Sequence, residues 1–279
     1  MRDGVSAWRH LGPQRGTGHH IPTKERVMLT TEFPPGSPCW VDLGSLDLET
    51  TTEFYSGLFG WRFQPVMEGY GFWQSDGKTV AAAGSVLEEG SGPAWMIYFH
   101  APDCDATAEA VQRAGGTVRA RPFDIEGQGR MAQFTDPAGA EFAAWQPGGT
   151  RGLDLVTEPG SLAWAELHVP DPDGVRGFYQ SVFGWRIEDM DMGDLAYPVV
   201  SPEGGGADSA MAGLMPLEPG GRAHWLPYFE VPDCDTTAAR CQTSGGSVHG
   251  PVDEVPGVGR MAFLSDPHGA RFAVITSSP

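Results

Sequence analysis

The chain has 279 residues, of which 40% are hydrophobic and 19% are charged, the balance of an ordinary globular protein. Its formal net charge of −18 disfavours nucleic acid and anionic membranes as partners, because both would repel it. We find no apolar run near the roughly 18 residues that a spanning helix needs, and no apolar core of a secretory signal near the N-terminus. We therefore expect a cytoplasmic protein, for which Met28 is an alternative native start.

The chain contains four cysteines and no CxxC motif, so the sequence indicates no zinc knuckle. Cys104 and Cys234 stand at equivalent positions of an internal repeat. That equivalence predicts two small buried residues that pack in the core, and it disfavours a disulfide between them.

The internal repeat is the strongest pattern in the sequence. FYSGLFGWR at Phe54–Arg62 returns as FYQSVFGWR at Phe178–Arg186, 124 residues later, and PDCD at Pro102–Asp105 returns at Pro232–Asp235, 130 residues later. The other repeated motifs are GRMA at Gly129–Ala132 and Gly259–Ala262, and DP at Asp136 and Asp266. Two shifts that differ by only 130 − 124 = 6 residues predict two copies of one domain, with six extra residues in the second.

The repeat sets the expected domain boundaries. Residues 1–36 are rich in Gly, Pro, His and basic residues without periodicity, which predicts a flexible N-terminal tail. The first domain is expected over 37–148 and the second over 161–277, with a Gly-rich linker over 149–160.

The first half of each domain is predicted from domain one. Trp40–Leu43 is a short strand, Asp47 then opens a helix with apolar residues at helical spacing, and Gly60 ends that helix. The strands expected after it are Arg62–Val66, Gly71–Gln74 and Thr79–Leu87.

The second half of the domain repeats this order. Trp95–Phe99 is a strand, and Asp103 or Asp105 caps a helix that runs to Arg113. The strands expected next are Thr117–Arg121, Arg130–Phe134 and Glu141–Trp145. Each domain therefore contains strand–helix–three strands twice, which predicts an α+β fold.

These residues resemble a known group. A first strand, an Asp before a helix that ends in FYxxxFGW, and a late DPxG turn before a final strand resemble the vicinal oxygen chelate superfamily. That superfamily contains glyoxalases, bleomycin-resistance proteins and extradiol dioxygenases. The resemblance covers residues 37–277, and the tandem arrangement is similar to an actinobacterial hydroxylase-like subgroup. It implies two tandem glyoxalase-like domains, each made of two units that form an incomplete barrel with the ligand on its concave face.

The resemblance also implies where metal-using members hold their ion: the first strand of each unit and the last strand. The residues at these positions here are Trp40, Met96 and Ala143 in domain one, and Trp164, Leu226 and Ala273 in domain two. None of these side chains suits a hard divalent ion, which prefers carboxylate, carbonyl or imidazole ligands. We expect no metal ligand set and no cofactor, since phosphate-binding loops are also missing. A divalent-metal-dependent glyoxalase or dioxygenase is the alternative.

Carboxylates stand beside these tryptophans. Residues two apart on a strand share a face, so Asp42 points the same way as Trp40, and Glu166 the same way as Trp164. A carboxylate against an aromatic wall has a raised pKa and suits acid/base catalysis. The alternative is a structural role, with Asp42 and Glu166 bonded to backbone or arginine, for which Arg130 and Arg260 are the expected partners.

Domain two carries more titratable groups than domain one. His168 shares the strand face of Glu166, and His224 lies just before a later strand, whereas domain one has Gly44 and Ala94 at these positions. We predict Glu166, His168 and Asp42 as catalytic candidates. Together with His224, the domain-two pair is expected to form an acid/base cluster or an unorthodox metal site.

A second group of residues is predicted to contact the ligand. Trp40, Trp73 and Trp164 are expected to stack on a flat molecule, which suits a hydrophobic, planar compound. The further ligand-binding candidates are Tyr70, Met131, Arg130, Arg260 and His224.

The predicted function follows from these sites. We expect a glyoxalase/bleomycin-resistance-like protein of secondary metabolism that acts on an aromatic or polyketide-like molecule as a metal-independent acid/base enzyme, of lyase, isomerase, cyclase or hydroxylation-assisting type. The alternatives are a non-catalytic protein that sequesters an antibiotic or metabolite, and the metal-dependent enzyme named above. A monomer or a homodimer is expected.

Overall fold

The fold consists of two domains of equal topology. A computed structural model describes residues 29–86, 92–192, 196–218 and 220–278. In domain one the elements are β1 (Pro38–Ser45), α1 (Leu48–Phe59), β2 (Arg62–Met67), β3 (Tyr70–Ser75), β4 (Lys78–Ser85), β5 (Ala94–His100), α2 (Cys104–Arg113), β6 (Thr117–Ile125), β7 (Gly129–Thr135) and β8 (Glu141–Pro147). The predicted order of strand–helix–three strands, twice, is confirmed; the predicted strand end at Leu87 lies outside the described residues.

Domain two repeats this order with a longer connection after its third strand. Its elements are β9 (Leu162–Val169), α3 (Pro172–Phe183), β10 (Arg186–Asp191), β11 (Ala196–Ser201), the 3₁₀ turn η2 (Ala207–Ser209), β12 (Ala212–Pro216), β13 (His224–Glu230), α4 (Cys234–Thr243), β14 (Ser247–Val255), β15 (Gly259–Ser265) and β16 (Arg271–Ser277). In domain one a tight turn at Asp76 and Gly77 joins the corresponding strands.

Each domain holds one eight-stranded sheet. The strand order is β2-β3-β4-β1-β5-β8-β7-β6 in domain one and β10-β11-β12-β9-β13-β16-β15-β14 in domain two. The first strands of the two units meet antiparallel in the centre, as β1 with β5 and β9 with β13, and each also pairs in parallel with the last strand of its own unit, as β1 does with β4. The end strands β2 and β6 do not pair with each other, so the curled sheet is an incomplete barrel, as expected.

The helices begin and end where local chemistry predicts. The Asp47 carboxylate accepts the backbone N–H groups of Glu49 and Thr50, and Gly60 ends α1 in the left-handed region at φ 76°. Asp171 and Gly184 do the same for α3. An aspartate N-cap contributes about 1 kcal/mol, and a glycine adopts positive φ without the Cβ clash, so these short motifs fix the helix ends.

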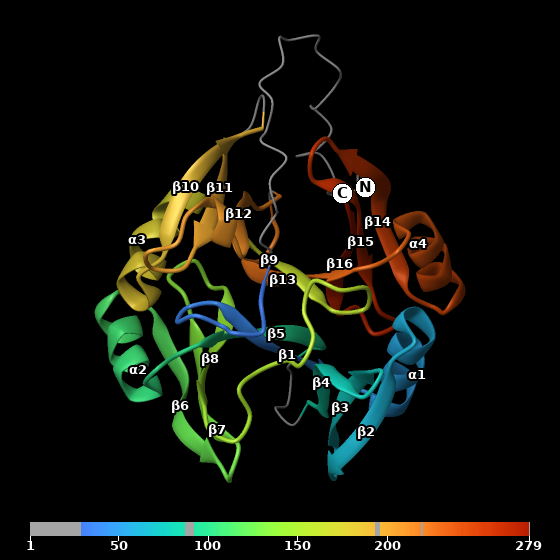
Figure 1. Ribbon diagram of the computed structural model, residues 1–279, viewed down its shortest axis with the longest axis horizontal. Helices are drawn as coiled ribbons and strands as arrows, with labels where there is room; N and C mark the ends of the chain where they lie inside the picture. Colours follow the sequence, from blue (N-terminus) through green and yellow to red (C-terminus); the bar gives the residue numbers. More distant parts are fainter. Residues whose placement is uncertain (1–28, 87–91, 193–195, 219, 279) are drawn as a thin grey trace.

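The repeated FGW and FY motifs join the two domains. The indole N–H of Trp61 donates to the Gly160 carbonyl at 2.8 Å, and Trp185 donates to the Gly36 carbonyl at the same distance. Helices of different domains pack side by side, α1 with α4 and α2 with α3 (Figure 1). Buried aromatic rings from both domains form one continuous cluster across this boundary.

A buried tyrosine of domain two reaches into domain one. The Tyr179 hydroxyl donates to Asp136 of the DP motif at 3.0 Å and accepts the indole N–H of Trp225 at 3.0 Å. Tyr55 faces Asp266 in the equivalent place, where the contact falls short of a hydrogen bond. The repeated motifs therefore build the interface between the domains as well as the fold of each domain.

The segments outside the domains also contact the core. Residues 1–28 of the predicted tail, Met28 included, lie outside the described residues, but Leu29 and Phe33 are buried. In the linker, Leu153 and Val156 are buried as well. Among the described residues, no helix is both long and apolar enough to span a membrane.

Candidate functional site

Domain one contains a cavity of about 510 Å³ on the concave face of its sheet. Residues of all eight strands of the sheet line it, so the curvature of the whole sheet forms it. The side chains that matter for its chemistry are Trp40, Asp42, Tyr70, Phe72, Tyr98, Met131, Gln133 and Trp145. Most of these side chains are aromatic or thioether groups, so the wall suits a flat apolar ligand.

Asp42 is the carboxyl group of this cavity. The Tyr98 hydroxyl donates to its Oδ2 atom at 2.8 Å, and the Tyr70 hydroxyl lies near enough to stabilise the charged carboxylate. Burial raises the pKa of Asp42 from 3.8 to about 7, and the two hydroxyl donors offset only part of that rise because they stabilise the charged form. The carboxyl group is therefore close to half protonated at neutral pH.

Domain two places Glu166 in the same setting, with one addition. Its carboxylate accepts from Tyr197 at 2.6 Å and from Tyr228 at 2.8 Å. The Nε2 atom of His168 lies 2.8 Å from Glu166 Oε2, at ion-pair distance. Burial raises the pKa of Glu166, but the nearby charge of His168 and the hydrogen bonds from the two tyrosine hydroxyls outweigh it, so the pKa is lowered overall.

The strand registers show that these two groups are equivalent. Tyr98 lies opposite Trp40 on the β1–β5 pair, and Tyr228 lies opposite Trp164 on the β9–β13 pair. The pairings β3–β4–β1 and β11–β12–β9 place Tyr70 and Tyr197 correspondingly. Each domain therefore carries one carboxyl group, two tyrosines and one tryptophan in the same arrangement.

The difference between the domains lies in the histidines. The rings of His168 and His224 stack with centroids 4.9 Å apart, and burial with the nearby charge of His168 lowers the pKa of His224 to about 4. The structure thus brings together Glu166, His168 and His224, as the sequence indicated. Domain one has Gly44 in place of His168, so Asp42 has no imidazole beside it and its pKa moves in the opposite direction.

The predicted aromatic residues lie on two different faces of the sheet. Trp40, Tyr70 and Met131 line the domain-one cavity, and Trp40 meets Phe72 edge to face at 5.3 Å. In domain two, Trp164 donates its indole N–H to Tyr197 at 3.2 Å. Trp73 is fully buried in the core and is absent from the cavity wall.

The position of Trp73 has a simple cause. Tyr70 and Phe72 alternate with Trp73 along β3, and adjacent residues of a strand point to opposite faces. The ring of Trp73 therefore packs 5.2 Å from that of Tyr55 and 5.4 Å from that of Trp61. The sequence pattern did not separate these two faces.

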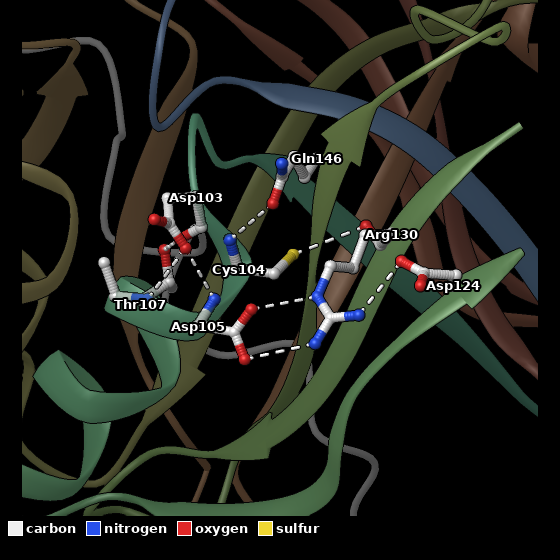
Figure 2. Close-up of polar contacts among 8 residues, drawn as sticks. Asp103, Cys104, Asp105, Thr107, Asp124, Arg130 and Gln146 are labelled. Atoms are coloured by element: carbon white, nitrogen blue, oxygen red, sulfur yellow. Dashed lines mark hydrogen bonds and ion pairs between the residues drawn. The ribbon is translucent and has the colours of Figure 1, made fainter.

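The structure does not bring the two predicted arginines to the cavity. Figure 2 shows Arg130 bound by both oxygens of Asp105, at 3.0 and 3.1 Å, and by Asp124 at 2.9 Å. Arg260 pairs with Asp235 in the same way, at 2.5 and 2.8 Å. The expectation that these arginines are the partners of Asp42 and Glu166 is wrong, because the PDCD motif supplies a nearer carboxylate on the outer face.

The PDCD and GRMA motifs contact each other in both domains. Asp103 caps α2 by accepting the backbone N–H groups of Asp105 and Ala106. The Cys104 thiol donates to the Arg130 carbonyl at 3.3 Å (Figure 2), and the Cys234 thiol donates to the Arg260 carbonyl at 2.9 Å. All four cysteines are buried and free, which confirms the packing role predicted for Cys104 and Cys234.

The donor set does not fit the metal of the metal-using relatives. The row across β1, β5 and β8 that faces the cavity reads Trp40, Tyr98 and Ala143, and the row in domain two reads Trp164, Tyr228 and Ala273. Among the residues that the structure describes, no three His, Cys, Asp or Glu side chains converge on a metal position. The predicted cluster of Glu166, His168 and His224 is likewise no ligand set, and we derive no step through a metal.

Sequence reasoning included Tyr70 among the ligand-binding residues but missed Tyr98, Tyr197 and Tyr228. Tyr98 and Tyr228 stand two residues after the predicted first-strand positions Met96 and Leu226 and are related by the 130-residue shift. That equivalence was a usable signal. Tyr197 falls in the stretch where the shift changes from 124 to 130, so no constant shift pairs it with Tyr70; only the strand register does.

Comparison with known proteins agrees with the fold. The Glyoxalase/Bleomycin resistance protein/Dioxygenase superfamily matches residues 40–144 and 161–274, and the chain belongs to this superfamily. It is 40% identical to the anthracycline biosynthesis protein DauV of a Streptomyces species and 39% identical to DnrV of Streptomyces peucetius, in each case over 88% of this chain and 94% of the relative. A putative glyoxylase of Mycobacterium bovis is 38% identical over 89% of this chain and 98% of the relative.

Solved structures share the fold at low sequence identity. A Mn(II)-bound glyoxalase from Novosphingobium aromaticivorans gives a TM-score of 0.62 at 18% identity, covering 87% of this chain and 82% of that chain. Homoprotocatechuate 2,3-dioxygenase from Brevibacterium fuscum, in a substrate complex, gives 0.61 at 16% identity, covering 88% and 82%. These structures show the architecture of the tandem sheets.

Proposed function

We propose that this protein is an acid/base enzyme of secondary metabolism, that its ligand is a planar polycyclic aromatic molecule of polyketide type, and that Asp42 transfers the proton. The observation that carries the proposal is a carboxyl group with a pKa of about 7 inside an aromatic cavity of about 510 Å³. The similarity to anthracycline biosynthesis proteins supports the ligand class.

Asp42 is suited to both directions of proton transfer. A catalytic group works best when its pKa lies near the working pH, since both protonation states are then populated. The Tyr98 hydroxyl bonds to one carboxylate oxygen of Asp42, and the Asp42 side chain lines the cavity. Trp40 and Phe72 supply an edge-to-face aromatic wall against which a flat ring system packs.

The chemistry that fits is a prototropic shift beside a ring ketone. The Asp42 carboxylate removes a proton from the carbon that is conjugated with the ketone, and the ketone oxygen takes one proton from solvent as the enol forms. The Asp42 carboxyl group then releases its proton to solvent, so the reaction is an isomerisation and needs no oxidant. Lyase and cyclase steps that pass through the same enol use the same residue.

The test uses 1,8-dihydroxyanthrone as the probe, under anaerobic conditions in D₂O. Binding is followed by quenching of tryptophan fluorescence, and proton removal by loss of the C10 proton signal in the NMR spectrum. We expect the protein to accelerate exchange with an inflection near pH 7, and Asp42→Asn to bind the probe without accelerating exchange. Acceleration that survives in Asp42→Asn would exclude this role for Asp42.

Two alternatives are separated by the same assay. A sequestering protein, as the apolar wall of the cavity also suits, binds the probe and releases it without exchange in either variant. The Glu166–His168 pair in domain two is a second candidate acid/base site, favoured by its 2.8 Å contact. Exchange lost in Glu166→Gln but retained in Asp42→Asn would assign the chemistry to domain two.

We also propose a cellular location and an oligomeric state for the protein. Four free buried thiols suit a reducing compartment, so we keep the cytoplasm as the proposed location. We propose a small-molecule ligand as the partner, and a monomer or a homodimer as the working state.

A further inference from the structure

A second cavity of about 450 Å³ adjoins the aromatic cavity of domain one. The two share Trp40, Phe72 and Thr150 in their walls, so they meet at the Trp40–Phe72 pair. On the far side, the walls are residues 149–154 of the linker and the segment that contains Thr31 and Phe33. We call this cavity the linker pocket.

The linker pocket has a different chemical character from the aromatic cavity. Its lining includes the hydroxyl-bearing residues Thr31, Thr79 and Thr150, the peptide groups of a Gly-rich turn, and Arg151. Hydroxyls and peptide groups accept hydrogen bonds from or donate them to oxygen-bearing groups, whereas the aromatic cavity offers mainly carbon atoms. The two cavities together therefore suit a ligand with one apolar part and one polar part.

The backbone around Arg151 is held in place on both sides. The Thr150 carbonyl accepts the indole N–H of Trp145 at 3.0 Å, and the Leu153 amide donates to the Cys39 carbonyl at 2.9 Å. Asp154 completes the anchorage to β4. Its amide donates to the Thr79 carbonyl at 2.8 Å, and its carboxylate accepts the Thr79 amide at 2.9 Å.

This arrangement leaves one unpaired cation at the pocket. Asp154 is a formal negative charge in the same lining, and one of its carboxylate oxygens accepts the Thr79 amide. Within the described ranges, the exposed guanidinium of Arg151 forms no ion pair or hydrogen bond with another residue. A chain of net charge −18 repels anions in general, so a positioned arginine provides the local attraction that an anionic group needs.

The geometry points to a bipartite ligand: a planar ring system in the aromatic cavity, and a carboxylate-bearing arm that passes the Trp40–Phe72 pair into the linker pocket and pairs with Arg151. The inference rests on the proposed function for the ring system and adds the arm as a determinant of specificity. It also gives the segment between the two domains a role in binding.

The test compares two probes that differ only in the arm. The acid is 4-(anthraquinone-2-carboxamido)butanoate and the neutral control is its methyl ester, each titrated by tryptophan fluorescence quenching. We expect the intact protein to bind the acid about fivefold more tightly than the ester, the size of an exposed ion pair, with the preference falling as salt rises. Arg151→Gln should abolish the preference and leave the Kd of the ester unchanged, while Arg151→Lys should retain part of it.

Arg121→Gln is the matched control, because Arg121 is an exposed arginine of β6 outside the pocket lining. Equal Kd values for acid and ester in the intact protein would overturn the arm proposal while leaving the ring site intact. An equal loss of preference in Arg121→Gln and Arg151→Gln would overturn it too, since general electrostatics would then explain the effect. Failure of both probes to bind would instead overturn the proposed ligand class.

Discussion

Replacement of Asp42 by asparagine should make the protein more stable at pH 8 and should change its stability little at pH 4. The folded state raises the pKa of Asp42 from 3.8 to about 7, with burial as the main cause. Between these two values the folded state keeps a proton that the unfolded state has released. The free energy of unfolding therefore falls as pH rises through this window.

The magnitude follows from the size of the shift. A shift of about 3 pKa units corresponds to about 4 kcal/mol at 1.36 kcal/mol per unit, which is the largest possible cost of ionising Asp42 in the fold. The side chain is only partly shielded, because one edge faces the cavity, so about 2–3 kcal/mol is the expected value. The asparagine variant carries no charge and escapes this cost at every pH.

Urea unfolding followed by tryptophan fluorescence at pH 5, 6, 7 and 8 measures the effect. The quantity of interest is the difference in unfolding free energy between Asp42→Asn and the unchanged protein, which should grow with pH. Tyr98→Phe is a second variant with a sharper expectation. It removes a hydrogen bond that favours the ionised carboxylate, so it should raise the pKa of Asp42 further and steepen the fall in stability with pH.

The raised pKa of Asp42 is refuted if the difference in unfolding free energy between Asp42→Asn and the unchanged protein stays constant within about 0.5 kcal/mol over this pH range, the usual uncertainty of such extrapolations. A constant difference would mean that Asp42 titrates alike in the folded and unfolded states. The cavity would then be open to water around the carboxyl group, and the acid/base proposal would lose its physical basis.

Three further variants test other parts of the structure. Glu166→Gln should destabilise the fold more at pH 7 than at pH 4, because the lowered pKa of Glu166 stabilises the fold above pH 4.5 and that contribution is lost as pH falls. Urea unfolding at pH 4 and 7 checks this expectation. A difference in unfolding free energy from the unchanged protein that widens toward pH 4 would contradict it. Tyr179→Phe leaves Oδ2 of the buried Asp136 without its donor and the Trp225 indole N–H without its acceptor, so it should cost about 2–3 kcal/mol, whereas an unchanged urea midpoint would exclude Tyr179 as an anchor between the domains. Gly213→Ala should lower the thermal midpoint and displace Tyr197, since an added Cβ at Gly213 would overlap the Tyr197 hydroxyl at a cost of about 1–3 kcal/mol; full stability would show that this site has room.

The repeat and the helix ends were predictable because their causes are local. Asp47 and Gly60 define α1 through hydrogen bonds and backbone angles within a few residues. The alternation along the first strand placed Asp42 and Trp40 on one face, and the cavity lining agrees. The family resemblance supplied the pairing of the two units, which no local pattern contains.

Other predictions failed because the sequence did not fix the partner. Arg130 was expected near Asp42, but the shift of 130 residues says only that Arg130 and Arg260 are equivalent, not which carboxylate each binds. Trp73 was expected at the ligand and lies in the core, because adjacent residues of a strand point to opposite faces, so a shift of one residue exchanges the cavity face and the packed face.

What the sequence by itself determined is therefore the duplication, the order of the elements and the carboxyl groups that face inward. Only the tertiary structure decided what surrounds those groups. Asp42 meets Tyr98 across 56 residues, and Glu166 meets Tyr228 across 62, through the antiparallel pairing of central strands. These long-range contacts supply the burial and the hydroxyl donors that both carboxyl groups share, whereas the opposite direction of their pKa shifts comes from His168, two residues after Glu166 on the same strand, where domain one has Gly44.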